Sequence, residues 1–306
     1  MNTRTEALPN ASFNRILLFG ANGQLGSKLT SLLAARGNVQ AVAHAEIDLR
    51  DLPTLRALIL KTQPALIVNA AAYTAVDAAE ADVEQARLVN TEAPRVMAEA
   101  ARECRALLVH YSTDYVFDGT AHAPYTEDSP VNPLGVYGTT KLAGEQAVAA
   151  AGAAHLILRT AWLYSNRGKN FLNTMLRLAA ERDELRVVND QAGCPTYADL
   201  VAEASVHILD GLYVGDRVRV ERCGLYHLTC QGETSWWGFA QRIIELAGYA
   251  ERVRVLPITT ADYPTPAKRP AYSVLSNAKL ERVFGICLPH WEEGLKRCLA
   301  ERDAQQ

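Results

Sequence analysis

Two side chains capable of acid–base chemistry, Tyr137 and Lys141, are separated by four residues. On a helix this spacing places both side chains on one face. A tyrosine with its ordinary pKa of about 10 is a poor acid or base at neutral pH, but a nearby ammonium favours its anion. The pair therefore predicts a proton-transfer site. A solvated helix face is the alternative, and the neighbouring motifs must decide between the two.

Ser112, Thr113 and Asp114 lie at the end of an apolar segment, 106–112, that predicts a strand. Ligands of open α/β sheets bind at the carboxyl ends of the strands, so these polar side chains are well placed for a substrate. We expect the Thr113 hydroxyl to hydrogen-bond a carbonyl oxygen that Tyr137 protonates.

Gly20, Gly23 and Gly26 stand where an apolar run, 15–20, turns into a helical pattern, 24–35. Glycines at such a turn let backbone N–H groups approach a pyrophosphate at the positive end of the helix. The three glycines therefore predict a dinucleotide site. With a nicotinamide cofactor bound there, Lys141 would hold its ribose, and hydride would arrive as the tyrosine gives up its proton. A tight turn without a ligand is the alternative.

The second predicted strand, 39–43, is not followed by the acidic residue that often binds the adenosine ribose. The nearest carboxylates are Glu46 and Asp48, and His44 leaves room for a 2′-phosphate. The sequence therefore predicts NADPH or NADH without a preference. Asp48 and Leu49 could contact the adenine, or they could be solvated loop residues.

Small side chains end the third predicted strand, 65–70, in the segment Asn69, Ala70, Ala71 and Ala72. A dinucleotide can lie across such a surface, so we include Ala70 and Ala72 in the cofactor site. Close packing of the backbone is the alternative explanation.

Strands and helices alternate up to about residue 165, which predicts a parallel sheet covered on both faces. Further helices are expected at 52–61, 90–104, 138–151, 170–182, 199–212, 236–247 and 291–300, and further strands at 155–160 and 225–229. The expected fold is α/β, a doubly wound parallel Rossmann sheet with a smaller C-terminal substrate-binding region. Residues 1–13 are expected to be a disordered extension. The NAD(P)-binding domain is expected at 14–165, with 199–230 rejoining it, and the substrate-binding region at 166–198 and 231–302.

Composition excludes several classes of protein. The 306 residues contain 31 Lys and Arg against 34 Asp and Glu, a net charge of −3 without runs of like charge, so a nucleic-acid partner is not expected. No apolar stretch approaches the roughly 18–20 residues of a membrane span. The residues before 15 lack an apolar signal region, which predicts a cytoplasmic protein. Six widely spaced cysteines are expected to be free thiols, without a zinc or dithiol motif.

The chain resembles the extended short-chain dehydrogenase/reductases over about 15–299. The resemblance rests on the segments 16–26, 68–77, 110–117 (HYSTDYVF), 137–145, 159–162 and 263–270 (YPTPAKRP). It implies reduction of the 4-keto group of dTDP-4-dehydro-L-rhamnose to dTDP-L-rhamnose with NADPH or NADH, the last step of dTDP-rhamnose biosynthesis.

The resemblance also implies roles for individual residues. The catalytic hydroxyl, tyrosine and lysine fall on Thr113, Tyr137 and Lys141. Thr113, Asp114 and Trp162 match positions that touch the sugar nucleotide, although core packing is an alternative for Trp162. Cofactor contacts fall on Gly23, Gln24, Leu25, Asp48, Leu49, Ala72, Tyr73, Thr74, Tyr137 and Lys141.

Some similar proteins bind Mg²⁺ through carboxylates at a dimer interface, which here would involve Asp199 and Glu292 and a homodimer. The third such position holds Lys28, whose ammonium cannot ligate a cation. Arg269 is a further candidate for the substrate diphosphate, because its guanidinium fork suits phosphate oxygens. A surface arginine beside prolines is the alternative.

Two other functions remain open from the residues. An epimerase or dehydratase of nucleotide sugars could use the same fold, but a dehydratase normally adds a second carboxylate, and no glutamate stands beside Asp114. A non-catalytic regulatory subunit, similar to the beta subunit of methionine adenosyltransferase, would keep the cofactor pocket. The presence of Thr113, Tyr137 and Lys141 together favours the enzyme.

Overall fold

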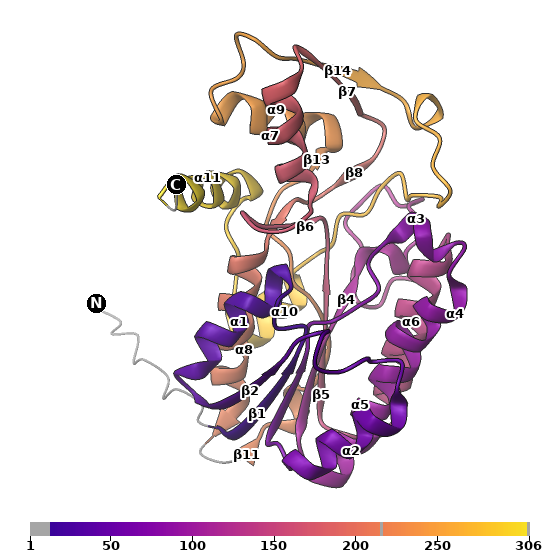
Figure 1. Cartoon of the computed structure of the whole chain (residues 1–306), viewed down its shortest axis with the longest axis vertical. Coiled ribbons are helices and arrows are strands. Elements are labelled where there is room, and N and C mark those ends of the chain that lie inside the picture. Colours follow the sequence, from indigo (N-terminus) through magenta and orange to yellow (C-terminus); the bar gives the residue numbers. More distant parts are fainter. Residues whose placement is uncertain (1–12, 215–216, 305–306) are drawn as a thin grey trace.

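A six-stranded parallel sheet forms the centre of the molecule. The computed structural model describes residues 13–214 and 217–304. The strands are β1 (Phe13–Phe19), β2 (Gly37–Val42), β3 (Leu66–Asn69), β4 (Leu107–Thr113), β5 (His155–Thr160) and β12 (Gly224–His227). Their order is β2-β1-β3-β4-β5-β12, so the order reverses between β1 and β3 (Figure 1). Such a reversal opens a crevice at the carboxyl ends of the strands. The predicted doubly wound α/β fold is confirmed.

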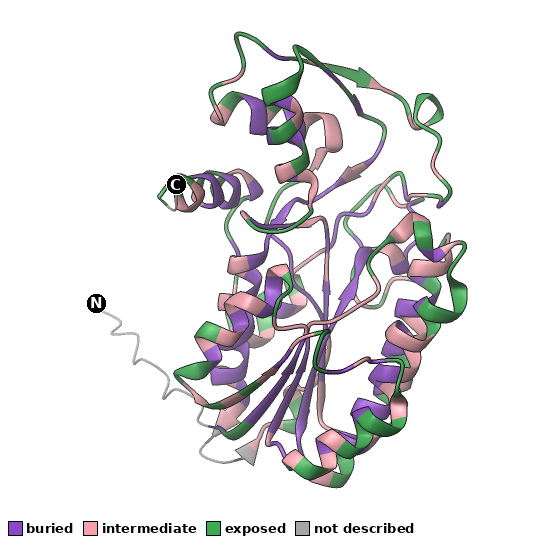
Figure 2. Ribbon diagram, in the orientation of Figure 1, coloured by how far each residue is buried: buried purple, intermediate pink, exposed green. Residues whose placement is uncertain are grey.

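Alternation along β1 explains how helices cover both faces of the sheet. Ile16 and Leu18 join the core with α1 (Gln24–Ala34) and α8 (Ala198–Leu212). Leu17 and Phe19 point the other way, into the core with α2 (Leu52–Thr62) and α5 (Ala93–Cys104). On that second face α6 (Val136–Ala150) packs beside α5. Buried residues accordingly concentrate along the strands and on the helix sides that face them (Figure 2).

The remaining described elements are shorter or lie beyond the sheet. A C-terminal lobe, which includes residues 171–193 and 234–258, sits over the carboxyl ends of the strands, whereas the helix at 278–284 packs against β12 of the sheet (Figure 1). In this lobe β7 and β14 pair in parallel. The other described elements are α3 (Val76–Ala79), α4 (Val83–Arg87), β6 (Leu163–Tyr164), α7 (Phe171–Glu181), β7 (Glu184–Val188), β8 (Ala192–Gly193), β9 (Thr196–Tyr197), β10 (Tyr213–Val214), β11 (Arg217–Val218), β13 (Thr234–Ser235), α9 (Trp236–Leu246), β14 (Arg254–Ile258), α10 (Ala278–Phe284) and α11 (Trp291–Asp303).

Most boundaries differ from the predicted ones by one or two residues. The helix expected from residue 90 has earlier turns, because α4 and a turn at Leu88–Glu92 lead into α5. Of the segment 1–13, predicted as a disordered extension, residues 1–12 lie outside the described residues, and Phe13 begins β1.

The state of the cysteines and the length of the helices bear on two expectations from composition. All six cysteines fall in the described part of the chain and carry free thiols, as predicted. Among the described helices, none combines the length and the apolar character needed to cross a membrane.

Candidate active site

The glycine turn after β1 packs directly against the chain that leaves β3. Gly20 has a φ of +82°, and a Cβ built there would lie 2.7 Å from the carbonyl carbon of Ala70. A Cβ on Gly26 would lie 2.0 Å from the carbonyl oxygen of Gly20. Neither position can hold a side chain without moving the backbone. The turn therefore keeps the beginning of α1 close to Ala70 and Ala71.

The N-terminus of α1 faces a small cavity and is not neutralised by protein groups. Gly23 is the N-cap, no side chain caps it, and the first turn contains no acidic residue. A cavity of about 260 Å³ is lined there by Asn22, Gly23, Gln24, Ser27, Arg167 and Gly168. The partial positive charge of a helix N-terminus attracts phosphate, and Arg167 adds a cation. These residues fit a pyrophosphate. Sequence reasoning missed Arg167, because no motif links it to the glycine turn.

The two residues after Gly23 have different roles. The side-chain oxygen of Gln24 accepts hydrogen bonds from Ser165 Oγ at 3.0 Å and Asn170 Nδ2 at 2.9 Å. This contact joins α1 to the segment that contains Arg167. Leu25 is buried in the core and anchors the first turn of the helix.

The carboxylates after β2 are already engaged by protein donors. Glu46 Oε2 accepts the Ala43 N–H at 2.7 Å. Asp48 pairs with the Arg50 guanidinium at 2.6 Å, and the hydrogen bond from Arg50 lowers the pKa of Asp48 to about 2. Leu49 is buried. The Arg50 guanidinium therefore lies beside Asp48 after β2, and Arg50 was not among the predicted site residues.

The predicted cofactor residues after β3 lie next to the glycine turn. Ala70 donates its N–H to the Phe19 carbonyl at 3.0 Å, and Ala72 follows it. Tyr73 donates its N–H to Asn90 Oδ1 at 2.9 Å and its hydroxyl to Asp82 at 2.8 Å. Thr74 is exposed. Hydrogen bonds therefore hold this segment, which begins with three alanines, beside the glycine turn.

The structure brings Thr113 and Tyr137 together. Thr113 ends β4 and Tyr137 lies in the first turn of α6. The Thr113 side chain lies close to Tyr137 and lowers the pKa of Tyr137, but burial outweighs this effect and raises that pKa to about 12. The Thr113 hydroxyl also donates to Asp114 Oδ1 at 3.0 Å. Tyr115 packs edge-on against Tyr137, with ring centroids 5.5 Å apart.

Lys141 is buried one turn further along α6 and points toward β4. Its Nζ donates to the Tyr111 carbonyl at 2.6 Å and lies 3.3 Å from His110 Nε2. Burial lowers the pKa of Lys141 to about 8, although the nearby Glu145 carboxylate opposes this. The ammonium was expected to favour the Tyr137 anion. Instead the pKa of Tyr137 is raised, because burial dominates.

Asp114 and Arg269 approach the same centre from two sides. Burial raises the pKa of Asp114 to about 6, while hydrogen bonds from Ser273 and Thr113 oppose the shift. Arg269 pairs with Asp77 at 2.8 Å and also hydrogen-bonds Tyr115, the ring that packs on Tyr137. Ser273 and Asp77 were not predicted, since only the folded chain brings them here.

Trp162 lies just beyond β5 and is stacked on Trp236 of α9. The ring centroids are 3.5 Å apart with an interplanar angle of 4°. Trp162 has a φ of +45°, and a Cβ on Gly193 would lie 2.4 Å from its ring. Both tryptophans remain partly exposed, so Trp162 is a surface platform and not a core residue. Sequence reasoning missed Trp236.

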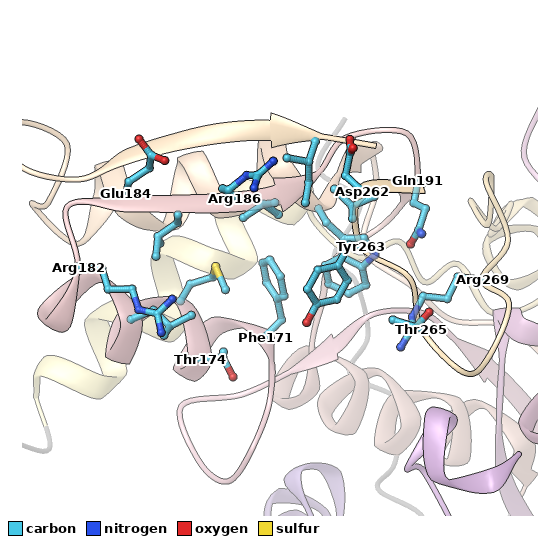
Figure 3. Close-up of a pocket in the computed structure, with 17 residues that line it drawn as sticks. Phe171, Thr174, Arg182, Glu184, Arg186, Gln191, Asp262, Tyr263, Thr265 and Arg269 are labelled. Atoms are coloured by element: carbon cyan, nitrogen blue, oxygen red, sulfur yellow. The ribbon is translucent and has the colours of Figure 1, made fainter. Parts of the chain in front are cut away.

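A cavity of about 670 Å³ opens in the C-terminal lobe between α7, β7 and the segment at 258–269. Figure 3 shows Arg182 and Arg269 at its two ends, with Phe171 and Tyr263 between them. It is lined by Phe171, Thr174, Met175, Leu178, Arg182, Glu184, Leu185, Arg186, Val187, Val188, Gln191, Trp236, Ile258, Asp262, Tyr263, Thr265 and Arg269. Aromatic rings and guanidinium groups suit a nucleotide diphosphate. Apart from Arg269, none of these residues was predicted.

The two carboxylates suggested for magnesium do not fit a metal site. Asp199 pairs with the Lys28 ammonium at 2.9 Å, and Glu292 lies 3.4 Å from Arg242 Nε. In the described part of the chain no three His, Cys, Asp or Glu side chains gather to hold a metal. Each of the two carboxylates therefore has a protein cation as its partner.

Comparison with known proteins identifies the family. The family model described as RmlD substrate binding domain matches residues 14–304. A curated dTDP-4-dehydrorhamnose reductase from Burkholderia thailandensis is 47% identical over 293 residues, covering 94% of this chain and 98% of the relative.

Solved structures agree with this match. A dTDP-4-dehydrorhamnose reductase from Clostridium acetobutylicum superposes with a TM-score of 0.88 at 39% identity, covering 95% of this chain and 100% of that one. The same enzyme from Bacillus anthracis, in complex with NADP, has a TM-score of 0.87 at 35% identity, covering 94% and 99%. The chain described here therefore belongs to the family of dTDP-4-dehydrorhamnose reductases.

Proposed function

We propose that the protein reduces the 4-keto group of dTDP-4-dehydro-L-rhamnose to give dTDP-L-rhamnose, using hydride from NADPH or NADH. The observation that carries this proposal is that Thr113 and Tyr137 come together at the carboxyl edge of the same sheet whose first strand leads into the glycine turn. The names of the relatives support the substrate, and the NADP complex of the Bacillus anthracis structure supports the cofactor.

Tyr137 is the proton donor in this proposal. Because its pKa is raised to about 12, its phenol stays protonated at neutral pH. Thr113 holds the substrate oxygen in line with that phenol. A reduced nicotinamide supplies hydride to the carbonyl carbon, and the Tyr137 proton moves to the oxygen, so a ketone becomes a secondary alcohol. The phenolate regains a proton from water.

The residues around the glycine turn hold the cofactor. Backbone N–H groups at Gly23 and Gln24 and the Arg167 guanidinium would bind the pyrophosphate. Gly20, Gly26, Leu25, Ala70, Ala72, Tyr73 and Thr74 shape the surface beneath it. Asp48 and Leu49, which follow β2, would lie at the adenosine end. Lys141 would hold the nicotinamide ribose. Residues 14–165 and 199–230 form this cofactor domain.

The cavity of the C-terminal lobe receives the nucleotide of the substrate. Arg182, Arg186 and Arg269 offer guanidinium groups to the diphosphate, and the Phe171 and Trp236 rings offer stacking surfaces to the base. Asp114 and Trp162, between this cavity and Tyr137, would contact the sugar. Residues 166–198 and 231–302 are therefore the substrate-binding region.

The rival functions have less support. Asp114 is followed by Tyr115, so no second carboxylate is available beside it for elimination of water. A regulatory subunit would have no use for a Thr113–Tyr137 pair at the carboxyl edge of the sheet. We propose a cytoplasmic enzyme, which six free thiols support, and a homodimer without a bridging metal.

The proposal is tested by identifying the product. The purified protein is incubated with NADPH and dTDP-4-dehydro-L-rhamnose, and the sugar nucleotide formed is compared by NMR with authentic dTDP-L-rhamnose. We expect dTDP-L-rhamnose and an equal amount of NADP⁺. Formation of the C4 epimer would assign the chain to a reductase of opposite stereochemistry. No reaction, although NADPH binds, would assign it to a different keto sugar or to a regulatory role.

A further inference from the structure

A chain of three buried polar side chains runs beneath the active site. Asn69 ends β3, His110 lies in β4 and Lys141 lies in α6, and each is at most 2% exposed. Asn69 Nδ2 is 3.0 Å from His110 Nδ1, and His110 Nε2 is 3.3 Å from Lys141 Nζ. Asn69 and His110 are direct partners in the parallel pairing of β3 and β4, so the sheet fixes their separation.

A backbone N–H group fixes which atoms donate and which accept hydrogen bonds among these three side chains. The Ala71 N–H can only donate, and it donates to Asn69 Oδ1 at 3.2 Å. The Asn69 amide nitrogen therefore faces His110, and it too can only donate. His110 Nδ1 must accept this hydrogen bond. Burial lowers the pKa of His110 well below its usual value, so the ring is neutral. A neutral ring that accepts at Nδ1 carries its hydrogen on Nε2.

The Nε2–H group of His110 then points at Lys141 Nζ. An ammonium has three hydrogens and no lone pair, so it cannot accept this hydrogen bond, whereas a neutral amine can. A neutral amine can still donate to the Tyr111 carbonyl, which lies 2.6 Å away. Both contacts of Lys141 with β4 are therefore satisfied only when the amine is uncharged.

The other groups that face Lys141 do not reverse this preference. Glu145, on the same helix, favours the ammonium. Its carboxylate, however, is bound by Arg159 of β5 at 2.6 and 2.9 Å, and this guanidinium offsets its charge. Tyr137 is a neutral phenol at neutral pH, since its pKa is raised.

We propose that His110 is a positioning residue whose Asn69-fixed tautomer disfavours the ammonium form of Lys141 and thereby lowers the pH at which Lys141 loses its charge. The row of three buried side chains thus couples the carboxyl end of β3 to Lys141, the residue that would hold the cofactor ribose. Only the activity measurement below rests on the proposed function; the spectroscopic measurement does not.

The first test uses the wild-type protein labelled with ¹⁵N-histidine. Long-range ¹H–¹⁵N spectra distinguish the two neutral tautomers and the imidazolium, and His110→Gln assigns the signal among the seven histidines. We expect a neutral His110 ring protonated on Nε2 at neutral pH. A ring protonated on Nδ1, or an imidazolium, would overturn the proposal whether or not the protein is a reductase.

The second test inverts the tautomer. In Asn69→Asp the carboxylate can still accept the Ala71 N–H, but it also accepts from His110 Nδ1–H, which leaves Nε2 as an acceptor for an ammonium. We expect the histidine signal to change tautomer and the alkaline limb of the kcat profile, at about pH 8 in the wild type, to move up by about one unit or more.

A double variant separates the tautomer from the added charge. Asn69→Asp with His110→Phe keeps the carboxylate and removes the imidazole. We expect most of the shift in the alkaline limb to disappear. An equal shift in the single and double variants would show that charge alone acts, and would overturn the role of His110. Thermal unfolding of each variant, compared with the wild type, confirms that the shifts are measured on folded protein.

Discussion

At the residue scale, Thr113 is the link between the proton donor and the buried acid, because its hydroxyl contacts both Tyr137 and Asp114. Thr113→Val keeps the shape of the side chain and removes that hydroxyl. We expect kcat to fall about 10²-fold, because one hydrogen-bond donor to the developing alkoxide is lost. Steady-state kinetics measure the effect. Thr113→Ser keeps the hydroxyl and is the matched control; an equal loss in both variants would contradict the role of the hydroxyl.

Asp114 predicts a pH-dependent stability. Since burial raises its pKa from 3.8 to about 6, the folded protein binds this proton more tightly than the unfolded chain does. The contribution of Asp114 to stability is therefore greatest below about pH 4 and is lost as the pH rises through about 6.

The variant Asp114→Asn removes this ionisation. We expect Asp114→Asn to be more stable than the wild type at about pH 8, by up to about 3 kcal/mol, and the difference to shrink toward zero at about pH 4. Urea unfolding at the two pH values measures it. A stability difference between Asp114→Asn and the wild type that does not change with pH would show that ionisation of Asp114 does not destabilise the folded protein.

The sequence predicted the positions of the proposed catalytic residues better than their surroundings. Thr113, Tyr137 and Lys141 could be found because strand ends and helical spacing are local properties of the chain. Ser273 and Trp236 could not, because they reach Asp114 and Trp162 only through long-range packing. The raised pKa of Tyr137 was also missed, since spacing predicts the nearby lysine but not the burial that opposes it.

At the element scale, the close approach of α1 to the end of β1 is the structural condition for the cofactor binding that we propose. Gly26→Ala adds a methyl group that would lie 2.0 Å from the Gly20 carbonyl oxygen, so the turn must open. We expect NADPH binding, measured by fluorescence titration, to weaken by at least about tenfold, because the N–H groups at the start of α1 no longer point at the pyrophosphate. Ser31→Ala, on the exposed face of α1, should bind like the wild type. Unchanged binding in Gly26→Ala would separate this turn from the cofactor.

The elements of the central sheet could be predicted because parallel strands are continuous apolar runs and the helices between them have clear periodicity. β3 and β4, for example, are buried along their whole length. The lobe could not be predicted in detail. Its two-residue strands β8 and β13 contain too little sequence for a pattern, and β7 pairs with β14, a strand far along the chain.

At the scale of the whole molecule, the Trp162–Trp236 stack joins the end of β5 to α9 of the C-terminal lobe. Trp236→Ala removes the stack and one wall of the large cavity. We expect KM for the sugar nucleotide to rise about tenfold or more, while the affinity for NADPH stays the same, because Trp236 lines the large cavity and not the cavity at the N-terminus of α1. The KM of Trp236→Phe, which keeps an aromatic ring, should lie between those of the wild type and Trp236→Ala. A loss confined to NADPH affinity would contradict this division.

The charge pairs between α1 and α8 and between α9 and α11 predict independence from metal ions. Lys28 neutralises Asp199, and Arg242 lies beside Glu292. We expect dialysis against EDTA to leave kcat and the mass measured by light scattering unchanged. A loss of activity or of a dimer on chelation, restored by Mg²⁺, would show that these carboxylates bind the ion in spite of their cations.

The central claim is that Tyr137 donates the proton while hydride reduces the 4-keto group. It is tested most directly by single-turnover oxidation of bound NADPH, followed by its absorbance, with saturating dTDP-4-dehydro-L-rhamnose in the wild type and in Tyr137→Phe. We expect rapid oxidation by the wild type and a rate about 10²–10⁴-fold lower in the variant at saturating NADPH. Oxidation at the wild-type rate by Tyr137→Phe would contradict the assignment of Tyr137 as the proton donor.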